Sequence, residues 1–172
     1  PDLSTVKDVP FEGGTTLGIA SYVVENDGSV FNEAFRSIRT ALKIGQPNQL
    51  AKTVVITSTS ADEGKTTTAI CLARTSAMAG IRTLLIDADT RRTATSRILS
   101  GSAAHGLLDL LDGSASIDDV LLEDGITGME LLPQKVRKTP NFDALQSTAM
   151  QDLLDQLKTR YDLIIIDAVP VL

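Results

Sequence analysis

One stretch, VVITSTSADEGKTTT at residues 54–68, constrains the fold of this chain more than any other. Residues 54–56 fit a buried parallel strand, residues 57–63 fit the loop that leaves its carboxyl end, and a helix is predicted to begin at Gly64. The backbone N–H groups of such a loop and the positive end of the helix dipole bind phosphate groups. The stretch therefore predicts a phosphate-binding loop, although Thr59 stands where the general pattern has its first glycine.

Two side chains at the start of the predicted helix suit a nucleoside triphosphate. Lys65 would reach the β- and γ-phosphates, and the hydroxyl of Thr66 would be a ligand of Mg²⁺. The alternative is a strand, a turn and a helix that carries an ordinary exposed lysine. The rest of the chain has to decide between the two interpretations.

Two later apolar runs also end in carboxylates. Residues 83–86 are followed by Asp87 and Asp89, and residues 163–166 are followed by Asp167. In an open parallel sheet the carboxyl ends of the strands line one crevice, so we expect these side chains to converge with the loop. A single aspartate after a strand often only caps a turn. Together, however, such carboxylates can hold the water shell of Mg²⁺ and accept a proton from an attacking hydroxyl.

Composition and charge limit the class of protein. A chain of 172 residues, 42% of them hydrophobic, fits one domain with a full core. The net charge of −6 argues against a nucleic-acid binder that relies on a basic surface. The single cysteine, Cys71, rules out an internal disulfide and favours a reducing compartment. No apolar run approaches the roughly 18 residues that cross a bilayer, so we expect a soluble chain.

The remaining segments indicate an α/β protein. Residues 1–27 are rich in turn formers and predict an extended lead-in, so the domain is expected to occupy residues 28–172. Residues 30–44 have helical periodicity with a basic edge, which from spacing alone is typical of an amphipathic surface helix. Further elements are predicted as a helix at 66–79, short helices near 107–111 and 117–122, a short strand at 129–132, and a long helix that begins near Thr148 with a capping box to Gln151.

Three motifs together resemble those of a known family. Residues 84–91, LLIDADTR, are similar to the Walker A′ motif of the bacterial tyrosine kinases, residues 56–67 to their Walker A and residues 161–167, YDLIIID, to their Walker B. These kinases are the cytoplasmic domains of exopolysaccharide and capsule co-polymerases. The segments 106–111 and 129–133 also lie where the family has related ones. The resemblance implies a three-layer α/β/α P-loop NTPase fold with a mainly parallel central sheet.

The resemblance also implies roles for individual residues, with ATP and Mg²⁺ as cofactors. Thr66, Asp87 and Asp167 would organise the metal ion and its waters. The residues implied for catalysis are Lys65, Asp87 and Asp89, where Asp87 or Asp89 would accept the tyrosyl proton, and Arg91 would support the site. The residues implied for nucleotide binding are Asp62, Glu63, Gly64, Lys65, Thr66 and Thr67.

The resemblance further implies an activity and partners. Glu33, Arg36 and Arg39 match the E-x-x-R-x-x-R helix that packs neighbouring subunits of the family into a ring, which replaces the surface-helix interpretation. The implied function is an ATP-dependent protein tyrosine kinase that autophosphorylates in trans and regulates exopolysaccharide or capsule biosynthesis and export. Its implied partners are copies of itself and a membrane-embedded co-polymerase segment or subunit. The implied location is the cytoplasm, at the inner face of the bacterial cell membrane.

Two departures from the family pattern affect these expectations. Ala61 and Asp62 stand where the family usually has Pro-Gly, and the charge of Asp62 beside the phosphates would weaken ATP binding unless its side chain turns outward. The sequence ends at Leu172, just after the third motif, and contains only Tyr22 and Tyr161. Family members continue into a tail of several tyrosines. We therefore expect a domain truncated after Walker B.

Two other functions stay open. A nucleotide-switched assembly module would bind ATP and oligomerise but phosphorylate nothing, and both Asp62 and the missing tyrosine cluster are compatible with it. A regulatory ATPase of the deviant Walker A type would carry a lysine five residues before Lys65, where this chain has Ser60.

Overall fold

A central sheet of five strands organises the protein, whose computed structural model describes residues 16–44, 52–101, 103–137 and 142–171. The strand order is β1-β5-β2-β4-β3, and neighbouring strands are parallel except β3 and β4, which are antiparallel. The prediction of a mainly parallel sheet is therefore confirmed. The strands are β1 (Thr53–Ile56), β2 (Thr83–Asp87), β3 (Leu122–Glu123), β4 (Glu130–Leu132) and β5 (Leu163–Asp167).

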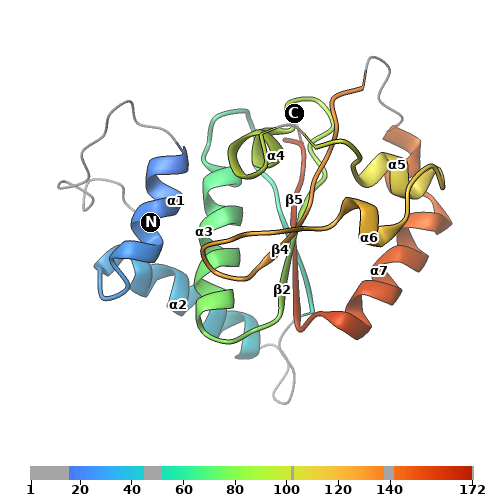
Figure 1. Cartoon of the computed structure of the whole chain (residues 1–172). Coiled ribbons are helices and arrows are strands. Elements are labelled where there is room, and N and C mark those ends of the chain that lie inside the picture. Colours follow the sequence, from blue (N-terminus) through green and yellow to red (C-terminus); the bar gives the residue numbers. More distant parts are fainter. Residues whose placement is uncertain (1–15, 45–51, 102, 138–141, 172) are drawn as a thin grey trace.

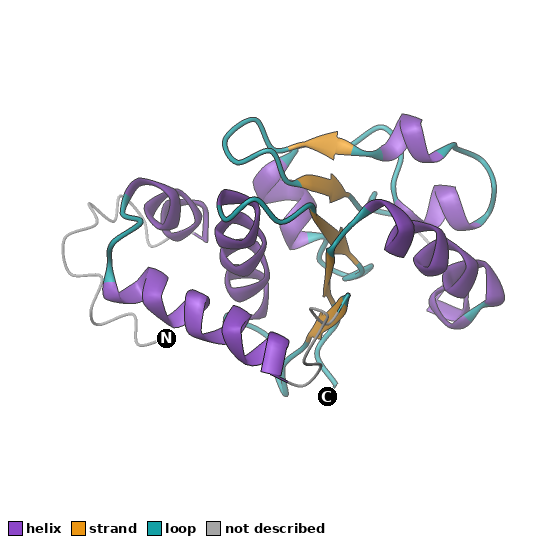
Figure 2. Ribbon diagram, turned by 90° about the horizontal axis from the view of Figure 1, so that it is seen from below, coloured by secondary structure: helices purple, strands orange, loops and turns teal. Residues whose placement is uncertain are grey.

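Helices cover both faces of the sheet, which gives the predicted three layers (Figure 1, Figure 2). On one face α3 lies against the strands, with α1 and α2 packed around it; α5, α6 and α7 lie on the other face. The short helix α4 follows β2. None of the helices in the described ranges is long and apolar enough to span a membrane. The helices are α1 (Thr16–Glu25), α2 (Val30–Ile44), α3 (Lys65–Met78), α4 (Ala94–Leu99), α5 (Leu107–Leu111), α6 (Ile117–Val120), the 3-10 helix η2 (Phe142–Gln146) and α7 (Thr148–Arg160).

The two central strands explain why their sequences are continuous apolar runs. Successive side chains of a strand point to opposite faces. In β5, Ile165 packs in the cluster that contains α3, whereas Ile164 and Ile166 pack in the cluster that contains Leu157 of α7. Because both faces are covered, every residue of β2 and β5 is buried.

The first helix corrects one prediction. Residues 16–25, predicted to be part of an extended lead-in, form α1, and the residues before them lie outside the described part of the chain. Ile19, Ala20 and Val23 are buried in the same core cluster as α3. The helix is stabilised by this tertiary packing, because a helix this short is marginal alone. Local sequence signals therefore did not reveal it.

The middle of helix α3 is buried on all sides. Residues all around its middle, from Ala69 to Ser76, are buried, because the sheet lies on one side and α1 and α2 on the other. Arg74 lies in this environment with only 2% of its side chain exposed. Its guanidinium makes two hydrogen bonds to the carboxylate of Asp124, at 3.0 and 3.1 Å, and donates to the backbone carbonyl of Ala20 at 2.7 Å.

Two smaller predictions are also wrong. Residues 54–56 were predicted as a buried strand, but β1 is an edge strand that pairs with β5, and Val55 is 59% exposed. The predicted capping box of α7 begins one residue too late. The N-cap is Ser147, whose hydroxyl accepts a hydrogen bond from the N–H of Met150, and Thr148 is the first helical residue.

Candidate functional site

The loop between β1 and α3 lies at the carboxyl edge of the sheet and contains a hydrogen bond between a side chain and its own backbone. The N–H of Thr59 donates to the carboxylate of Glu63 at 2.9 Å. Gly64 precedes the first residue of α3 and has a φ of 86°, a conformation that costs glycine little. Asp62 also lies in the left-handed region, with a φ of 64°, which aspartate tolerates better than most residues. The loop therefore enters α3 through two left-handed residues, and one of them is an aspartate.

Lys65 joins the ends of β2 and β5. Its Nζ lies 2.9 Å from Oδ2 of Asp89 and 3.7 Å from Oδ1 of Asp167. The lysine side chain is 8% exposed, and the two carboxylates are 1% and 0% exposed. The three strand ends therefore meet, as the apolar runs and their terminal carboxylates predicted.

Asp167 accepts hydrogen bonds from the hydroxyl groups of two helices. Thr66 of α3 and Thr95 of α4 both donate to its Oδ2, at 2.8 and 2.7 Å. Its Oδ1 is buried and accepts no hydrogen bond within the described structure. Burial raises the pKa of Asp167, although the hydrogen bond from Thr95 and the charge of Lys65 act against it. One buried carboxylate oxygen is thus available to a cation.

Asp87 organises the turn that leads into α4. Its Oδ2 accepts hydrogen bonds from the N–H and the hydroxyl of Ser96, at 2.9 and 2.6 Å, and its Oδ1 accepts from the N–H of Asp89 at 3.0 Å. Burial raises the pKa of Asp87 to about 6, and the hydrogen bonds from Ser96 oppose the rise. Asp87 therefore positions the chain that carries Asp89.

Asp89 has the opposite electrostatic character. Its Oδ1 accepts hydrogen bonds from the backbone N–H groups of Arg91 and Arg92, at 3.1 and 3.0 Å. Burial acts to raise its pKa, but the backbone of Arg92 and the ammonium of Lys65 outweigh burial, so the pKa of Asp89 is lowered. The structure therefore favours Asp89 as an anion.

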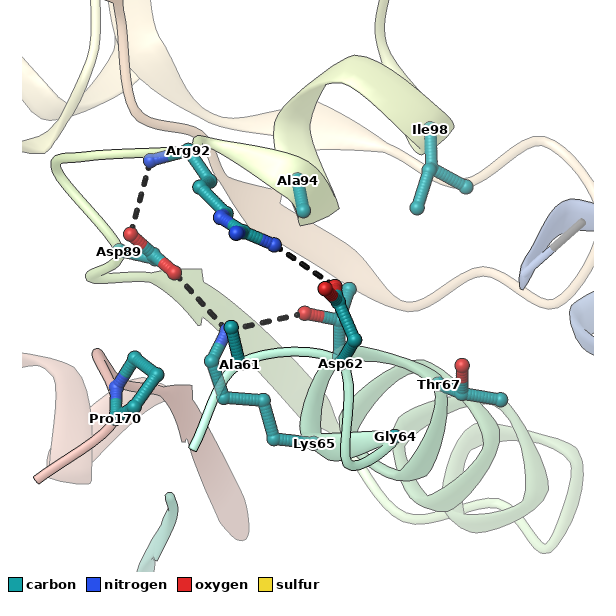
Figure 3. A pocket seen from close by; sticks show the side chains of 11 residues that line it. Ala61, Asp62, Gly64, Lys65, Thr67, Asp89, Arg92, Ala94, Ile98 and Pro170 are labelled. Atoms are coloured by element: carbon teal, nitrogen blue, oxygen red, sulfur yellow. Dashed lines mark hydrogen bonds and ion pairs between the residues drawn. The ribbon is translucent and has the colours of Figure 1, made fainter. Parts of the chain in front are cut away.

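A cavity of about 260 Å³ opens over the loop. Figure 3 shows Lys65 and Asp89 on one side of it, with Arg92 and Asp62 pointing toward each other. Nη1 of Arg92 lies 2.8 Å from Oδ1 of Asp62. The lining residues are Ala61, Asp62, Gly64, Lys65, Thr66, Thr67, Asp89, Arg92, Ala94, Ile98 and Pro170.

The donor atoms around this cavity fit Mg²⁺ bound with a nucleotide. Thr66 and Asp89 line the cavity with a hydroxyl and a carboxylate, the oxygen ligands that Mg²⁺ prefers. Asp167, which accepts the hydrogen bond from Thr66, adds an Oδ1 that accepts no hydrogen bond within the described structure. Among the described residues, no group of three or more histidine, cysteine or acidic side chains forms a complete metal site. That is compatible with Mg²⁺, which usually takes one or two carboxylates and completes its shell with phosphates and water.

The residues predicted for oligomerisation lie away from this cavity, on α2. Arg36 pairs with Glu33 at 2.9 Å and with Asp27 at 2.7 Å. Arg39 donates to the backbone carbonyl of Thr75 in α3 at 2.8 Å. Arg39 therefore anchors α2 to α3 within the subunit, whereas the side chains of Glu33 and Arg36 are 57% and 39% exposed.

Sequence analysis missed three residues of the site. Thr95 and Ser96 bind Asp167 and Asp87, and Arg92 pairs with Asp62 across the cavity. All three belong to the polar run that follows Asp89, where α4 was not predicted. That run, directly after a strand end with two carboxylates, was the available signal.

Comparisons with known proteins found a matching family and several similar proteins. Residues 51–172 match the family described as AAA domain. The tyrosine-protein kinase CpsD of Streptococcus agalactiae is 36% identical over 142 residues, which are 81% of this chain and 60% of CpsD. The tyrosine-protein kinase etk of Escherichia coli (strain K12) is 30% identical over 158 residues, which are 91% of this chain and 22% of that protein.

A solved structure shows the same fold. The kinase domain of Escherichia coli tyrosine kinase ETK superposes with a TM-score of 0.79 at 30% identity, covering 87% of this chain and 58% of that one. The chain therefore spans between about a fifth and three fifths of the lengths of these relatives.

Proposed function

This chain belongs to the AAA domain family and, within it, to the bacterial tyrosine kinase domains, and from that premise we propose that it binds ATP with Mg²⁺ and transfers the γ-phosphate to a tyrosine hydroxyl. The observation that carries the proposal is the meeting of Lys65 with Asp89 and Asp167 beneath the loop. A lysine, a helix N-terminus and buried carboxylates at one cavity suit a bound triphosphate and its metal ion.

The proposed binding roles follow from the contacts. The backbone of residues 62–67 and the ammonium of Lys65 would hold the phosphates, and Thr66, Asp87 and Asp167 would hold the metal ion directly or through water. Mg²⁺, when bound, supplies charge neutralisation at the phosphates. Lys65 must then exchange its contact with Asp89 for a phosphate oxygen. This exchange frees Oδ2 of Asp89.

Asp89 is the better candidate for contact with the tyrosyl hydroxyl. Asp89 lines the cavity, whereas Asp87 does not. Both carboxylate oxygens of Asp87 accept hydrogen bonds, from the N–H of Asp89 and from Ser96 of α4. Once Lys65 has moved to the phosphates, the pKa of Asp89 loses one of the contacts that lower it. We assign proton acceptance to Asp89 and positioning of Asp89 to Asp87. Phosphoryl transfer depends mainly on positioning and charge stabilisation, which this arrangement supplies.

Calorimetric titration with Mg-ATP and Mg-ADP tests the binding step, with Lys65→Met as the loss-of-function variant. Transfer of radiolabel from γ-labelled ATP to a tyrosine-containing copolymer, followed by phosphoamino acid analysis, tests the chemical step. We expect label on tyrosine that both Lys65→Met and Asp89→Asn abolish. Binding without label in any variant would refute the kinase and leave a nucleotide-binding protein.

The biological setting is also part of the proposal. CpsD and etk are named tyrosine-protein kinases. By analogy, this domain would work in the cytoplasm at the inner face of the membrane, bound to a co-polymerase segment or subunit, in exopolysaccharide or capsule production. The exposed pair Glu33 and Arg36 on α2 would contact a neighbouring copy in a ring. Sedimentation of the wild-type chain and of Arg36→Ala tests this, and equal masses for the two would contradict it.

One observation favours a second candidate, the nucleotide-switched assembly module. The sequence has two tyrosines, and neither is presented as an acceptor: Tyr161 is buried and bonded to Glu130, and the ring of Tyr22 packs edge-on against Phe31. Phosphorylation in trans would need tyrosines other than these. A chain that binds Mg-ATP, assembles with it and labels no tyrosine in an added substrate would fit this candidate.

A further inference from the structure

Arg92 stands over the proposed phosphate site and belongs to none of the predicted roles. The charged side chains that line the cavity are two cations, Lys65 and Arg92, and two anions, Asp62 and Asp89. Each cation is paired with one of the anions: Lys65 with Asp89 at 2.9 Å and Arg92 with Asp62 at 2.8 Å. Both cations must therefore change partners if a polyphosphate enters.

The backbone of Arg92 is anchored while its side chain is exposed. Its N–H donates to Oδ1 of Asp89 at 3.0 Å, and Oδ2 of the same carboxylate contacts Lys65. The two cations are thus tied to one aspartate and face one cavity, from α3 and from the turn after β2. The exposed guanidinium of Arg92 and the buried ammonium of Lys65 therefore line the same space (Figure 3).

The pair of Arg92 with Asp62 is suited to exchange. The two side chains are 55% and 83% exposed, and ion pairs at such exposure contribute little to stability. A phosphate offers a guanidinium stronger, often bidentate, charge-assisted hydrogen bonds. The backbone of Asp62, in the phosphate loop, has a left-handed conformation. Its carboxylate forms the ion pair with the guanidinium of Arg92.

We propose that Arg92 binds the polyphosphate group, and that Asp62 holds its guanidinium over the loop until the nucleotide takes the place of the carboxylate. The inference rests on the proposed nucleotide site and adds a residue to it. It also changes the meaning of Asp62. Its negative charge is paired with Arg92, and a bound nucleotide would displace the carboxylate of Asp62 from the guanidinium.

Titration calorimetry with Mg-ATP and with magnesium tripolyphosphate tests the assignment in wild type, Arg92→Met, Asp62→Asn and the double variant. Arg92→Met should lower the affinity for both ligands about tenfold or more, as expected for loss of a hydrogen bond to a charged group. Asp62→Asn should raise the affinity for both ligands, and this gain in affinity should be smaller in the double variant with Arg92→Met. All these side chains are exposed, so the variants should unfold at the wild-type temperature.

Arg82→Met is the matched control. Arg82 forms an exposed pair with Asp162 at 2.7 Å, at the opposite end of β2, and its loss should leave both affinities unchanged. Lys65→Met should abolish binding and thereby identify the site.

The outcomes separate this inference from the proposed function. If wild type binds Mg-ATP, Lys65→Met does not, and Arg92→Met binds within twofold of wild type or more tightly, the role of Arg92 is refuted while the nucleotide site stands. Weakening for Mg-ATP but not for tripolyphosphate would also refute a phosphate contact. An equal gain from Asp62→Asn in both backgrounds would refute the competition with Asp62. If wild type binds neither ligand, both proposals fail.

Discussion

Changing Asp87 to asparagine should alter how the stability of the fold depends on pH. Burial raises the pKa of this carboxyl to about 6, from an ordinary value of 3.8, and the hydrogen bonds from Ser96 offset burial only in part. The folded protein therefore holds the proton more tightly than the unfolded chain does. Between the two pKa values the folded state binds more protons, so the free energy of unfolding falls as the pH rises.

The size of the effect follows from the shift. A rise of about two pKa units corresponds to about 3 kcal/mol, at 1.36 kcal/mol per unit. The stability that protonated Asp87 contributes is fully present below about pH 4 and is lost by about pH 6. The raised pKa of Asp167 acts in the same direction and the lowered pKa of Asp89 in the opposite one. To first order both are common to the two proteins, so the difference between wild type and Asp87→Asn isolates Asp87.

Urea unfolding followed by circular dichroism, in buffers from about pH 4 to pH 8 with a chelator present, measures this difference. Relative to Asp87→Asn, wild type should lose about 3 kcal/mol across the range. Ser96→Ala is a useful second variant, because it removes one hydrogen bond that opposes burial. The loss of stability should then become larger and extend to higher pH. Parallel curves for wild type and Asp87→Asn would refute the reasoning, since Asp87 would then ionise as freely in the folded as in the unfolded protein.

Three further predictions concern stability and use the same urea assay. Arg74→Met should cost about 3–5 kcal/mol, because it leaves the carboxylate of Asp124 without its buried partner. The double variant with Asp124→Asn should recover part of that loss, and full additivity of the two changes would contradict the pairing. Gly106→Ala should destabilise by about 1–3 kcal/mol, because a Cβ there would lie 2.5 Å from a backbone nitrogen of the segment after β4; an unchanged midpoint would contradict that contact. Ser147→Ala should cost about 1 kcal/mol and Thr148→Ala less than about 0.5 kcal/mol, whereas the reverse order would favour the predicted capping box.

Local patterns predicted the parts of the fold that depend on neighbours in sequence. The helix at 30–44 has the predicted bounds, and the hydroxyl of Ser29 caps its N-terminus by accepting a hydrogen bond from the N–H of Asn32. The apolar runs at 83–86 and 163–166 became the two central strands. A helix or a buried strand leaves a period or an unbroken apolar run in the sequence, so these elements were predictable.

The features that were not predicted share a different cause. Helix α1 and the exposure of Val55 depend on which elements lie beside them. Arg74 is buried because α1 packs against the outer side of α3. No local pattern reports such long-range packing.

For the site, the sequence by itself determined the chemical groups: a phosphate loop with Lys65 and Thr66, and carboxylates at the ends of two further apolar runs. Because parallel strands present their carboxyl ends at one edge, the meeting of these groups was also predictable. Only the tertiary structure decided which partner each of these groups contacts, and therefore which role each can have. The strand order brings Lys65 between Asp89 and Asp167, α4 turns Ser96 onto Asp87, and Arg92 reaches Asp62 from the turn after β2. Hydrogen bonds and ion pairs act over a few ångströms in space, whatever the separation of the residues along the chain.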